Sequence, residues 1–287
     1  MLTADSHVHS EWSWDTGGPD SGARGTMVAT CEQALRIGLP ALIFTEHFDV
    51  EEAWRAGTEE FPPAASQHIN EAGYLVPPPL DVEGYFGAIA ECRRLFPDLT
   101  ILSGVEFGQP HLVEHRARQL VDLSRFDRVN GSLHTLRVGP DRAEPITLYR
   151  HWGPDEVMDA YLDEVPAMLA SDAFEVFTHL DYAVRHWPVE QAGRFDPRRF
   201  EGQFRVALRA VAESGRALEM NTRRLSSWLP QWWTEEGGQA VSFGSDAHVP
   251  TALAGGFPEA QHMLEHFGFR PGRRPEDLWT RRPAPRR

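Results

Sequence analysis

Short runs of Val, Ile, Leu and Phe alternate along this chain with longer segments whose apolar residues recur at helical spacing. The runs cover residues 2–9, 41–48, 100–107, 128–134, 174–181, 217–221 and 240–246. They are largely apolar throughout instead of alternating with polar residues, which is typical of strands buried on both faces of a parallel sheet. The pattern therefore predicts about seven parallel β-strands.

The segments between these runs have the periodicity of amphipathic helices. They cover residues 26–37, 82–96, 112–123, 154–169, 197–214 and 258–267, with a weaker Trp-rich segment at 230–236. A strand followed by a helix, repeated about seven times, favours a closed barrel over an open sheet. We therefore expect an α/β fold, a TIM-like (β/α)7 barrel, formed by residues 1–287 as a single domain.

Two segments interrupt the alternation of strands and helices. Residues 49–80 are rich in Pro, Gly and Glu, and a segment of this length without periodicity predicts a lid-like loop over the strand ends. Residues 268–287, which end in RRPAPRR, have lost apolar periodicity. We expect this tail to lie on the surface or to be frayed.

Composition narrows the class of protein further. Hydrophobic residues make up 41% of the chain, but no apolar run is long enough to span a bilayer and the first residues lack the pattern of a signal peptide. The formal net charge of −14 repels phosphate backbones and so disfavours nucleic acid as a partner. We therefore expect a cytoplasmic protein without a membrane or nucleic-acid partner, as a monomer or small homo-oligomer.

Two residue types limit the chemistry. Cys31 and Cys92 each lie in a segment of helical periodicity, which suits reduced core residues better than a disulfide. All 28 basic residues counted as Lys or Arg are Arg, because the sequence contains no Lys. This absence excludes a Schiff-base lysine, a phosphate-loop lysine and a carbamylated lysine that bridges two metal ions.

Histidine and acidic residues stand at the end of nearly every predicted strand. These ends are Asp5-Ser6-His7-Val8-His9, Glu46-His47, Glu106, His134, His179-Leu180-Asp181 and Asp246-Ala247-His248. In a parallel barrel the carboxyl ends of the strands meet at one rim, so these side chains converge on one site. Alternate residues of a strand point to the same side, which directs both imidazoles of His7 and His9 at one ion. The sequence therefore predicts a multinuclear metal site.

The same residues carry a resemblance to a known family. DSHVHS, FTEHFD, GVEFG, GSLHTL, THLDY and GSDAH, which follow in this order from residue 5 to residue 248, resemble the motifs of the polymerase and histidinol phosphatase (PHP) superfamily. The length, the GSLH segment and the stretch THLDYAVRH make the chain most similar to the histidinol-phosphatase branch. The resemblance implies a distorted (β/α)7 barrel whose carboxyl strand ends usually hold three metal ions, commonly zinc, manganese or iron.

The resemblance also implies a distribution of ligands. One ion would be held by His7, His9, Glu106 and Asp246, and Glu106 would bridge to a second ion held by His134 and His179. A third ion would take Asp15, His47 and His248. Asp15 lies in the loop EWSWDTGG, where many relatives have a histidine or an acid. Glu46 replaces an Asp that is common in relatives, and we expect it to orient a ligand from behind.

The implied reaction is hydrolysis of a small phosphorylated metabolite, with L-histidinol phosphate favoured, by metal-activated hydroxide. The residues expected to act in catalysis are Glu106, Asp246, His248 and Arg185. The planar guanidinium of Arg matches phosphate oxygens. Arg185 matches a basic position of the family, and Arg223 and Arg224 follow the sixth predicted strand beside Asn221. These four residues are the candidates for substrate binding.

Three other functions are compatible with parts of the pattern. A nucleotide or another small phosphate ester is the alternative substrate within the same chemistry. An amidohydrolase also begins with His-x-His and ends with a strand-end Asp, but its common two-metal form uses the carbamylated lysine that is excluded here. A catalytically silent metal-binding regulatory domain belongs to a different class, and such relatives usually lose ligands, whereas this chain keeps the set.

Overall fold

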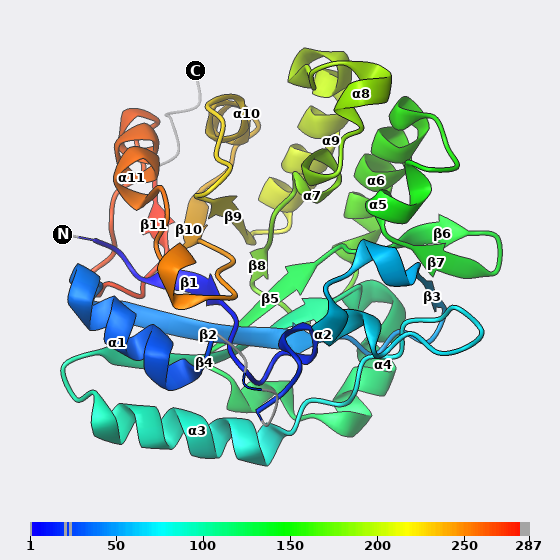
Figure 1. Cartoon of the computed structure of the whole chain (residues 1–287). Helices are drawn as coiled ribbons and strands as arrows, with labels where there is room; N and C mark the ends of the chain where they lie inside the picture. Colours follow the sequence, from blue (N-terminus) through cyan, green and yellow to red (C-terminus); the bar gives the residue numbers. More distant parts are fainter. Residues whose placement is uncertain (1, 20–21, 23–24, 282–287) are drawn as a thin grey trace.

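The main sheet of the protein is curled and has eight strands (Figure 1). The structure is a computed structural model that describes residues 2–19, 22 and 25–281. In spatial order the strands are β1 (Asp5–Val8), β2 (Ala41–Phe48), β4 (Thr100–Gly108), β5 (Arg128–Ser132), β8 (Val176–Phe177), β9 (Ala217–Asn221), β10 (Ala240–Gly244) and β11 (Trp279–Thr280). The first seven pair in parallel. The predicted strands are thus confirmed.

The sheet closes into a barrel only at its carboxyl end. The N–H of His9 donates to the carbonyl of Ala247, and the N–H of Asp246 donates to the carbonyl of His7, both at 2.9 Å. These bonds join the ends of β1 and β10. At the other end β11 runs antiparallel to β10. The expected α/β barrel is confirmed, and its distortion lies where β1 and β10 separate.

Residues 268–281 of the expected surface tail lie mostly on the surface but pack two side chains into the core. Phe269 and Trp279 are buried, and the indole N–H of Trp279 donates to Thr3 Oγ1 at 3.2 Å. The Trp279 ring also packs against Phe243, with ring centroids 4.9 Å apart. Isolated apolar residues give no periodicity, yet they cover the open part of the barrel. Residues 282–287 lie outside the described part of the chain.

The described residues form eleven α-helices, most of which lie in an outer layer around the sheet (Figure 1). They are α1 (Met27–Ile37), α2 (Pro63–Ser66), α3 (Val82–Leu95), α4 (Pro110–Leu120), α5 (Pro145–Leu148), α6 (Pro154–Met168), α7 (Tyr182–Arg185), α8 (Val189–Ala192), α9 (Glu201–Glu213), α10 (Trp228–Glu235) and α11 (Phe257–His266). Short 3-10 turns are η1 (Trp14–Thr16), η2 (Thr58–Glu60), η3 (Leu123–Arg125), η4 (Pro197–Phe200) and η5 (Pro250–Ala252). Each predicted helical segment therefore contains a helix.

Local sequence sets the helix ends. The Thr26 side chain accepts from the N–H of Ala29, and Asp81 accepts from the N–H of Gly84, so both residues cap a first turn. α1 ends at Gly38, which adopts the left-handed conformation at φ 72°. The segment predicted from residue 112 starts earlier, because Pro110 suits the first helical turn.

The segment 49–80 has more structure than a bare loop. It contains η2, α2 and strand β3 (Trp54–Arg55), which joins β7 (Asp141–Ala143) and β6 (Leu136–Val138) in a second, three-stranded sheet. A small hydrophobic cluster joins Trp54, Ala65 and Leu75 of this segment to Trp14 of η1. The Pro and Gly content conceals these few apolar residues, which are enough to fix the segment beside the carboxyl end of the barrel.

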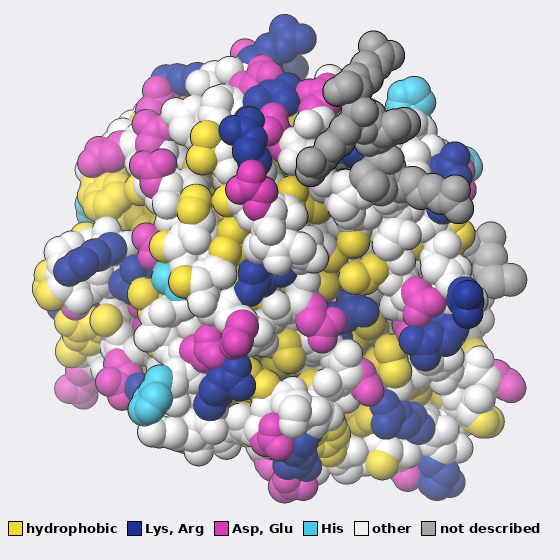
Figure 2. Space-filling model, turned by 180° about the vertical axis from the view of Figure 1, so that it is seen from behind, with side chains coloured by type: hydrophobic (Ala, Val, Ile, Leu, Met, Phe, Trp, Pro, Cys, Tyr) yellow, Lys and Arg dark blue, Asp and Glu magenta, His cyan; other side chains and the backbone are white. Residues whose placement is uncertain are grey.

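Acidic and Arg side chains are interspersed on the back face of the molecule (Figure 2). Arg205 on α9 contacts Glu201, Glu235 and Glu236. In the core, Cys31 and Cys92 are buried free thiols. None of the helices within the described ranges is both long enough and hydrophobic enough to cross a bilayer.

Candidate metal centre

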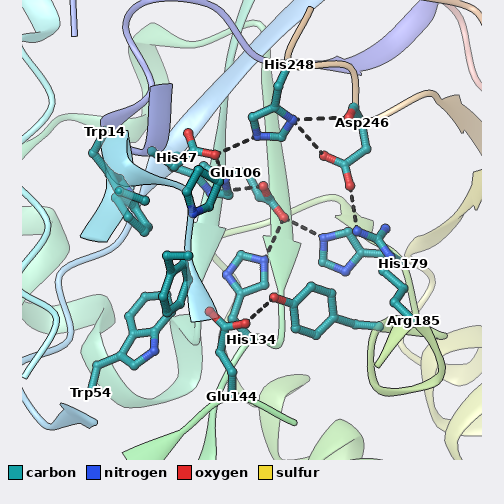
Figure 3. A pocket seen from close by; sticks show the side chains of 15 residues that line it. Trp14, His47, Trp54, Glu106, His134, Glu144, His179, Arg185, Asp246 and His248 are labelled. Carbon is teal, nitrogen blue, oxygen red and sulfur yellow. Dashed lines mark hydrogen bonds and ion pairs between the residues drawn. The ribbon is translucent and has the colours of Figure 1, made fainter. Parts of the chain in front are cut away.

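A pocket of about 170 Å³ lies at the carboxyl end of the barrel (Figure 3). Its floor and one wall come from the strand ends and the loops that follow them, with the side chains of His47, Glu106, His134, His179, Asp246 and His248. Trp14, Trp54 and Phe61 line the side near the segment 49–80. This pocket therefore contains side chains that the sequence predicted to converge at one rim.

Glu106, at the end of β4, lies at the centre of the cluster. Its Oε2 is 3.2 Å from His7 Nε2, 3.4 Å from His9 Nε2 and 3.2 Å from His47 Nδ1. Its Oε1 is 3.1 Å from His134 Nε2 and 2.6 Å from His179 Nε2. Because the two oxygens face different groups of imidazoles, one carboxylate can contact two neighbouring ions.

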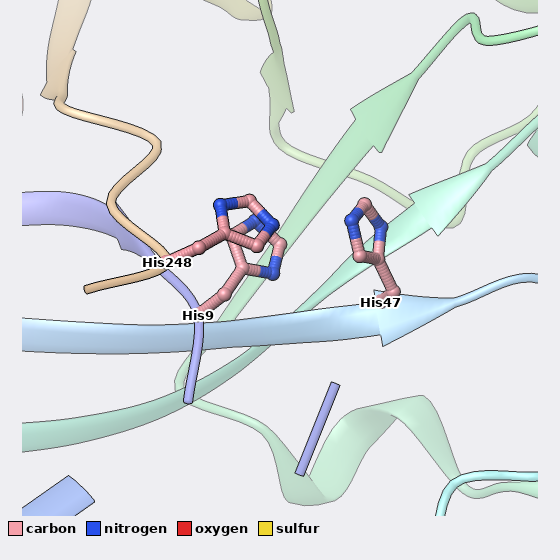
Figure 4. Close-up of side chains that lie close together, drawn as sticks. All are labelled: His9, His47 and His248. Carbon is pink, nitrogen blue, oxygen red and sulfur yellow. The ribbon is translucent and has the colours of Figure 1, made fainter. Parts of the chain in front are cut away.

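The remaining predicted ligands lie on the side of His9. Asp246 Oδ1 is 3.4 Å from His9 Nε2, and Asp15 Oδ2 is 2.9 Å from His248 Nε2 and 3.8 Å from His47 Nε2. The rings of His47 and His248 flank His9, at centroid distances of 4.4 and 4.1 Å (Figure 4). The structure thus places Asp15 beside both of its expected partners, His47 and His248.

Four combinations of side chains have donor atoms close enough to share an ion, all within 4.8 Å of one another. They are His7, His9 and Asp246; His7, Glu106 and His179; His47, Glu106 and His134; and His9, His47 and His248. The combinations overlap at His7, His9, His47 and Glu106. One continuous cluster, and not separate isolated sites, is therefore the arrangement in which ions would bind.

Backbone conformation at this rim is unusual. His179 and Asp246 have positive φ angles of 25° and 53°, and Gln109 has a φ of 45°. Non-glycine residues adopt this region at a cost, and such residues concentrate at functional sites. Gln109 is also connected to the cluster, because its side-chain carbonyl accepts the N–H of His134 at 2.8 Å while its amide donates to Glu51.

The charges of the cluster hold its carboxylates ionised. Burial by itself would raise the pKa of Glu106, but the neighbouring His7, His134 and His47 outweigh it and hold this pKa well below its usual range. Burial acts on Asp246 in the same direction, and Arg185 and His7 outweigh it there too, so its pKa is also well below the usual range. Both side chains therefore carry negative charge at neutral pH.

The donor set fits divalent metal ions. His7 Nε2 and His9 Nε2 lie 3.0 Å apart and both face Glu106 and Asp246. Burial lowers the pKa of His47 to about 4, and burial followed by the charge of Arg185 lowers that of His179. At His7 burial acts in the same direction, but the charges of Glu219 and Glu106 outweigh it and raise the pKa well above its usual range, so an ion that binds there would displace a proton. Neutral imidazoles and ionised carboxylates are the forms that bind zinc, manganese and iron. Lone pairs that converge in this way are best stabilised by a shared cation.

Sequence reasoning missed Glu219, the residue that orients His7. Glu219 lies in β9, the strand whose end offered no predicted ligand, and is 1% exposed. His7 Nδ1 lies 2.5 Å from Glu219 Oε2, so a proton on Nδ1 leaves Nε2 free to bind an ion. The available signal was a single acid in the otherwise mostly apolar run ALEMN.

Glu46 reaches His9 through a serine. Ser13 Oγ donates to Glu46 Oε2 at 2.8 Å and lies 2.9 Å from His9 Nδ1. The N–H and hydroxyl of Ser10 also donate to the Glu46 carboxylate. Glu46 is thus positioned to fix the His9 ring from behind, as the orientation role inferred from the sequence requires.

We expect Glu219→Gln to weaken metal binding by about 10- to 100-fold, because the amide holds the Nδ1 proton of His7 less strongly than a carboxylate does. Competition for metal against a chelator of known affinity measures the effect. Glu213→Gln is a matched control, because Glu213 is an exposed acid on α9. Equal metal affinity in the Glu219 and Glu213 variants would contradict the orienting role.

The candidate phosphate-binding residues are unequally placed. Arg185 lines the pocket, and its Nη1 donates to Asp246 Oδ2 at 2.6 Å. Its Nε and Nη2 are buried without a hydrogen-bond partner among the described residues. Asn221 is buried outside the pocket lining, and Arg223 and Arg224 are exposed. Arg224 lines a neighbouring depression together with Arg185.

The barrel fold and the histidine and carboxylate side chains clustered at its rim together define a metal-binding α/β barrel protein. The family model described as "PHP domain" matches residues 5–223, more than half of the 287-residue chain. The chain therefore belongs to the PHP domain family, and the resemblance found in its motifs is confirmed.

Two named relatives cover different shares of the chain. A Clostridium acetobutylicum protein named "Probable histidinol-phosphatase" is 24% identical over 282 residues, which is 94% of this chain and 96% of the relative. A Thermotoga maritima protein with the same name is 27% identical over 124 residues, 40% of this chain and 51% of the relative. Similarity to the first relative thus extends over nearly the whole of both chains.

Solved structures support the fold independently. A crystal structure of histidinol phosphate phosphatase from Lactococcus lactis, complexed with zinc, L-histidinol and phosphate, has a TM-score of 0.70 and 22% identity. It covers 93% of this chain, and this chain covers 94% of it. A structure from Listeria monocytogenes has a TM-score of 0.61 at 16% identity, with 89% and 99% covered. The barrel architecture is therefore shared over nearly the full length.

Proposed function

We propose that this protein is a metal-dependent phosphatase that hydrolyses L-histidinol phosphate to histidinol and inorganic phosphate. The observation that carries the proposal is the carboxylate of Glu106, whose two oxygens face different groups of histidines in a pocket that also contains the Arg185 guanidinium. An ion cluster and an adjacent guanidinium together match the charge of a phosphate monoester.

We assign three ions to the cluster. His7, His9 and Asp246 would hold one with an oxygen of Glu106, and the other oxygen of Glu106 would join His134 and His179 at the second. Asp15, His47 and His248 would hold the third. When bound, zinc, manganese or iron ions acidify a water molecule to supply the nucleophile and neutralise the oxygens of the phosphate group.

The side chains around the ions have separate tasks in this scheme. Arg185 has two N–H groups, at Nε and Nη2, without a hydrogen-bond partner among the described residues, and we assign these to phosphate oxygens while Nη1 keeps its contact with Asp246. Glu219 and the Glu46–Ser13 pair hold His7 and His9 in the orientation that directs their Nε2 atoms inward. Trp14, Trp54 and Phe61 limit the pocket to a small substrate.

The choice of substrate rests on the relatives. The full-length relative from Clostridium acetobutylicum bears the name of a histidinol-phosphatase, and the Lactococcus lactis structure contains L-histidinol and phosphate. Aromatic side chains in the pocket suit an imidazole ring, which packs on aromatic faces. A nucleotide is the alternative that the test must separate, because its base also packs on aromatic rings.

Phosphate release from a panel of esters tests the proposal. The panel contains L-histidinol phosphate, AMP and p-nitrophenyl phosphate, and the enzyme used has a measured metal content. We expect kcat/KM for L-histidinol phosphate to exceed the other values by at least about 10-fold, a preference of roughly 1.4 kcal/mol in transition-state binding. A higher kcat/KM for AMP would overturn the substrate assignment, and no release from any ester would overturn the phosphatase itself.

A further inference from the structure

Of the four carboxylates that line the pocket, one forms no ion pair with a histidine among the described residues. Asp15, Glu106 and Asp246 each face histidines of the cluster, whereas Glu144 belongs to no combination of candidate ligands found in the described residues. Glu144 stands between β7 and α5 and lines the same pocket. Figure 3 shows it on the opposite side of the pocket from His248 and Asp246.

The surroundings of Glu144 supply little to balance its charge. Tyr182 donates its hydroxyl to Glu144 Oε2 at 2.6 Å and is the one side-chain donor to this carboxylate among the described residues. The residue is 4% exposed. Burial raises the pKa of Glu144 to about 7, because the nearby charge of His134 offsets only part of the cost. A carboxylate in such a place gains free energy when a cation binds next to it.

We propose that Glu144 selects substrates that carry a protonated amino group close to the phosphate, by accepting N–H bonds from that ammonium group. The inference rests on the proposed phosphatase function and names its substrate class, the 2-aminoalkyl phosphates. In L-histidinol phosphate the amino group is separated from the ester oxygen by two carbons. Phosphate at the ion cluster and an ammonium group at Glu144 can therefore belong to one small molecule in one pocket.

Two physical effects give the selection. An ammonium–carboxylate hydrogen bond is charge-assisted and stronger than a neutral one. An ester without the amino group covers the buried Glu144 carboxylate without offering it an N–H donor, which costs binding free energy. Glu144 thus favours aminoalkyl phosphates both by attraction and by rejecting esters that lack the amine. The aromatic rings of Trp54 and Tyr182 remain available to the imidazole of the substrate.

The test compares Glu144→Gln with wild type on two esters that differ in one group. These are L-histidinol phosphate and 3-(imidazol-4-yl)propyl phosphate, which keeps the imidazole and lacks the amine. We expect Glu144→Gln to lower kcat/KM for the first by about 10- to 100-fold and to change the second by less than about 3-fold. Metal content should be equal in both proteins.

A binding measurement provides a readout independent of turnover. Calorimetry with L-histidinol, which has the amine but no phosphate, should show about 10- to 100-fold weaker binding to Glu144→Gln than to wild type. Glu59→Gln is the matched control, because Glu59 is an exposed carboxylate near the pocket that pairs with Arg150 and is not part of the pocket lining. The Glu59→Gln substitution removes the same charge and should leave kcat/KM for L-histidinol phosphate and the affinity for L-histidinol unchanged.

Three results would overturn the role of Glu144. They are an equal loss on both esters, an equal loss in Glu59→Gln, and wild-type affinity for L-histidinol in Glu144→Gln. Failure of the phosphatase function gives a different result, namely no phosphate release from any ester by wild type while L-histidinol binding still depends on Glu144. Conversely, if wild type hydrolyses both esters well and neither kcat/KM value depends on Glu144, the selective role of Glu144 is excluded and the phosphatase function stands.

Discussion

Glu106→Gln is expected to lower kcat at least about a hundredfold on the best phosphate substrate. The carboxylate offers one oxygen to His7, His9 and His47 and the other to His134 and His179. An amide loses the negative charge and turns an NH2 group toward one of these sets, so it can no longer contact two ions through oxygen. Steady-state kinetics on protein of measured metal content checks the result.

Asp15→Asn is the comparison for this variant. Asp15 contacts His248 and His47 on one side of the cluster only, so its loss affects the third assigned ion and leaves the shared carboxylate in place. We expect Asp15→Asn to retain more activity than Glu106→Gln. If Glu106→Gln keeps a rate close to wild type, Glu106 does not bridge two ions.

Arg185→Ala is expected to lose about 2–4 kcal/mol in kcat/KM, the cost of a charge-assisted bidentate contact with phosphate. The guanidinium is held by Asp246 through Nη1, and its Nε and Nη2 are buried without a partner among the described residues. Arg185→Lys should recover part of the loss, because an ammonium supplies charge without the planar fork. Kinetics of the three proteins gives the comparison.

The division between KM and kcat distinguishes the kind of contact Arg185 makes. A contact of equal strength in the ground and transition states raises KM, whereas a contact that strengthens in the transition state lowers kcat as well. Metal content should stay at the wild-type value, and a decrease would instead indicate that Arg185 acts by holding Asp246. Wild-type kcat/KM in Arg185→Ala would move the search for phosphate contacts to Arg223 and Arg224.

The positions of strands and of most cluster residues could be predicted because both follow from local pattern. The runs at 41–48 and 217–221 coincide with β2 and β9. Because the carboxyl ends of the strands in a parallel barrel meet at one rim, residues at these ends could be placed together without knowledge of individual contacts. The same rule located His7 and His134, which contact Glu106, and Asp246, whose Oδ1 lies 3.7 Å from His7 Nε2.

Contacts between residues far apart in sequence could not be predicted. Glu219 and His7 are 212 positions apart, and no spacing rule connects the middle of one strand to the end of another. Trp279 and Trp54 are isolated apolar residues in segments without periodicity, yet one covers the open part of the barrel and the other lines the pocket. Their roles depend on the shape of the finished barrel, which the local sequence does not encode.

Elemental analysis of the purified protein, paired with phosphate release before and after chelation, tests the multinuclear metal centre most directly. We expect about two to three equivalents of zinc, manganese or iron per chain, loss of hydrolysis when a chelator removes them, and recovery when Mn or Zn is added back. Less than about one equivalent after metal-supplemented expression, with no activity regained on adding Mn or Zn, would contradict the metal-dependent mechanism.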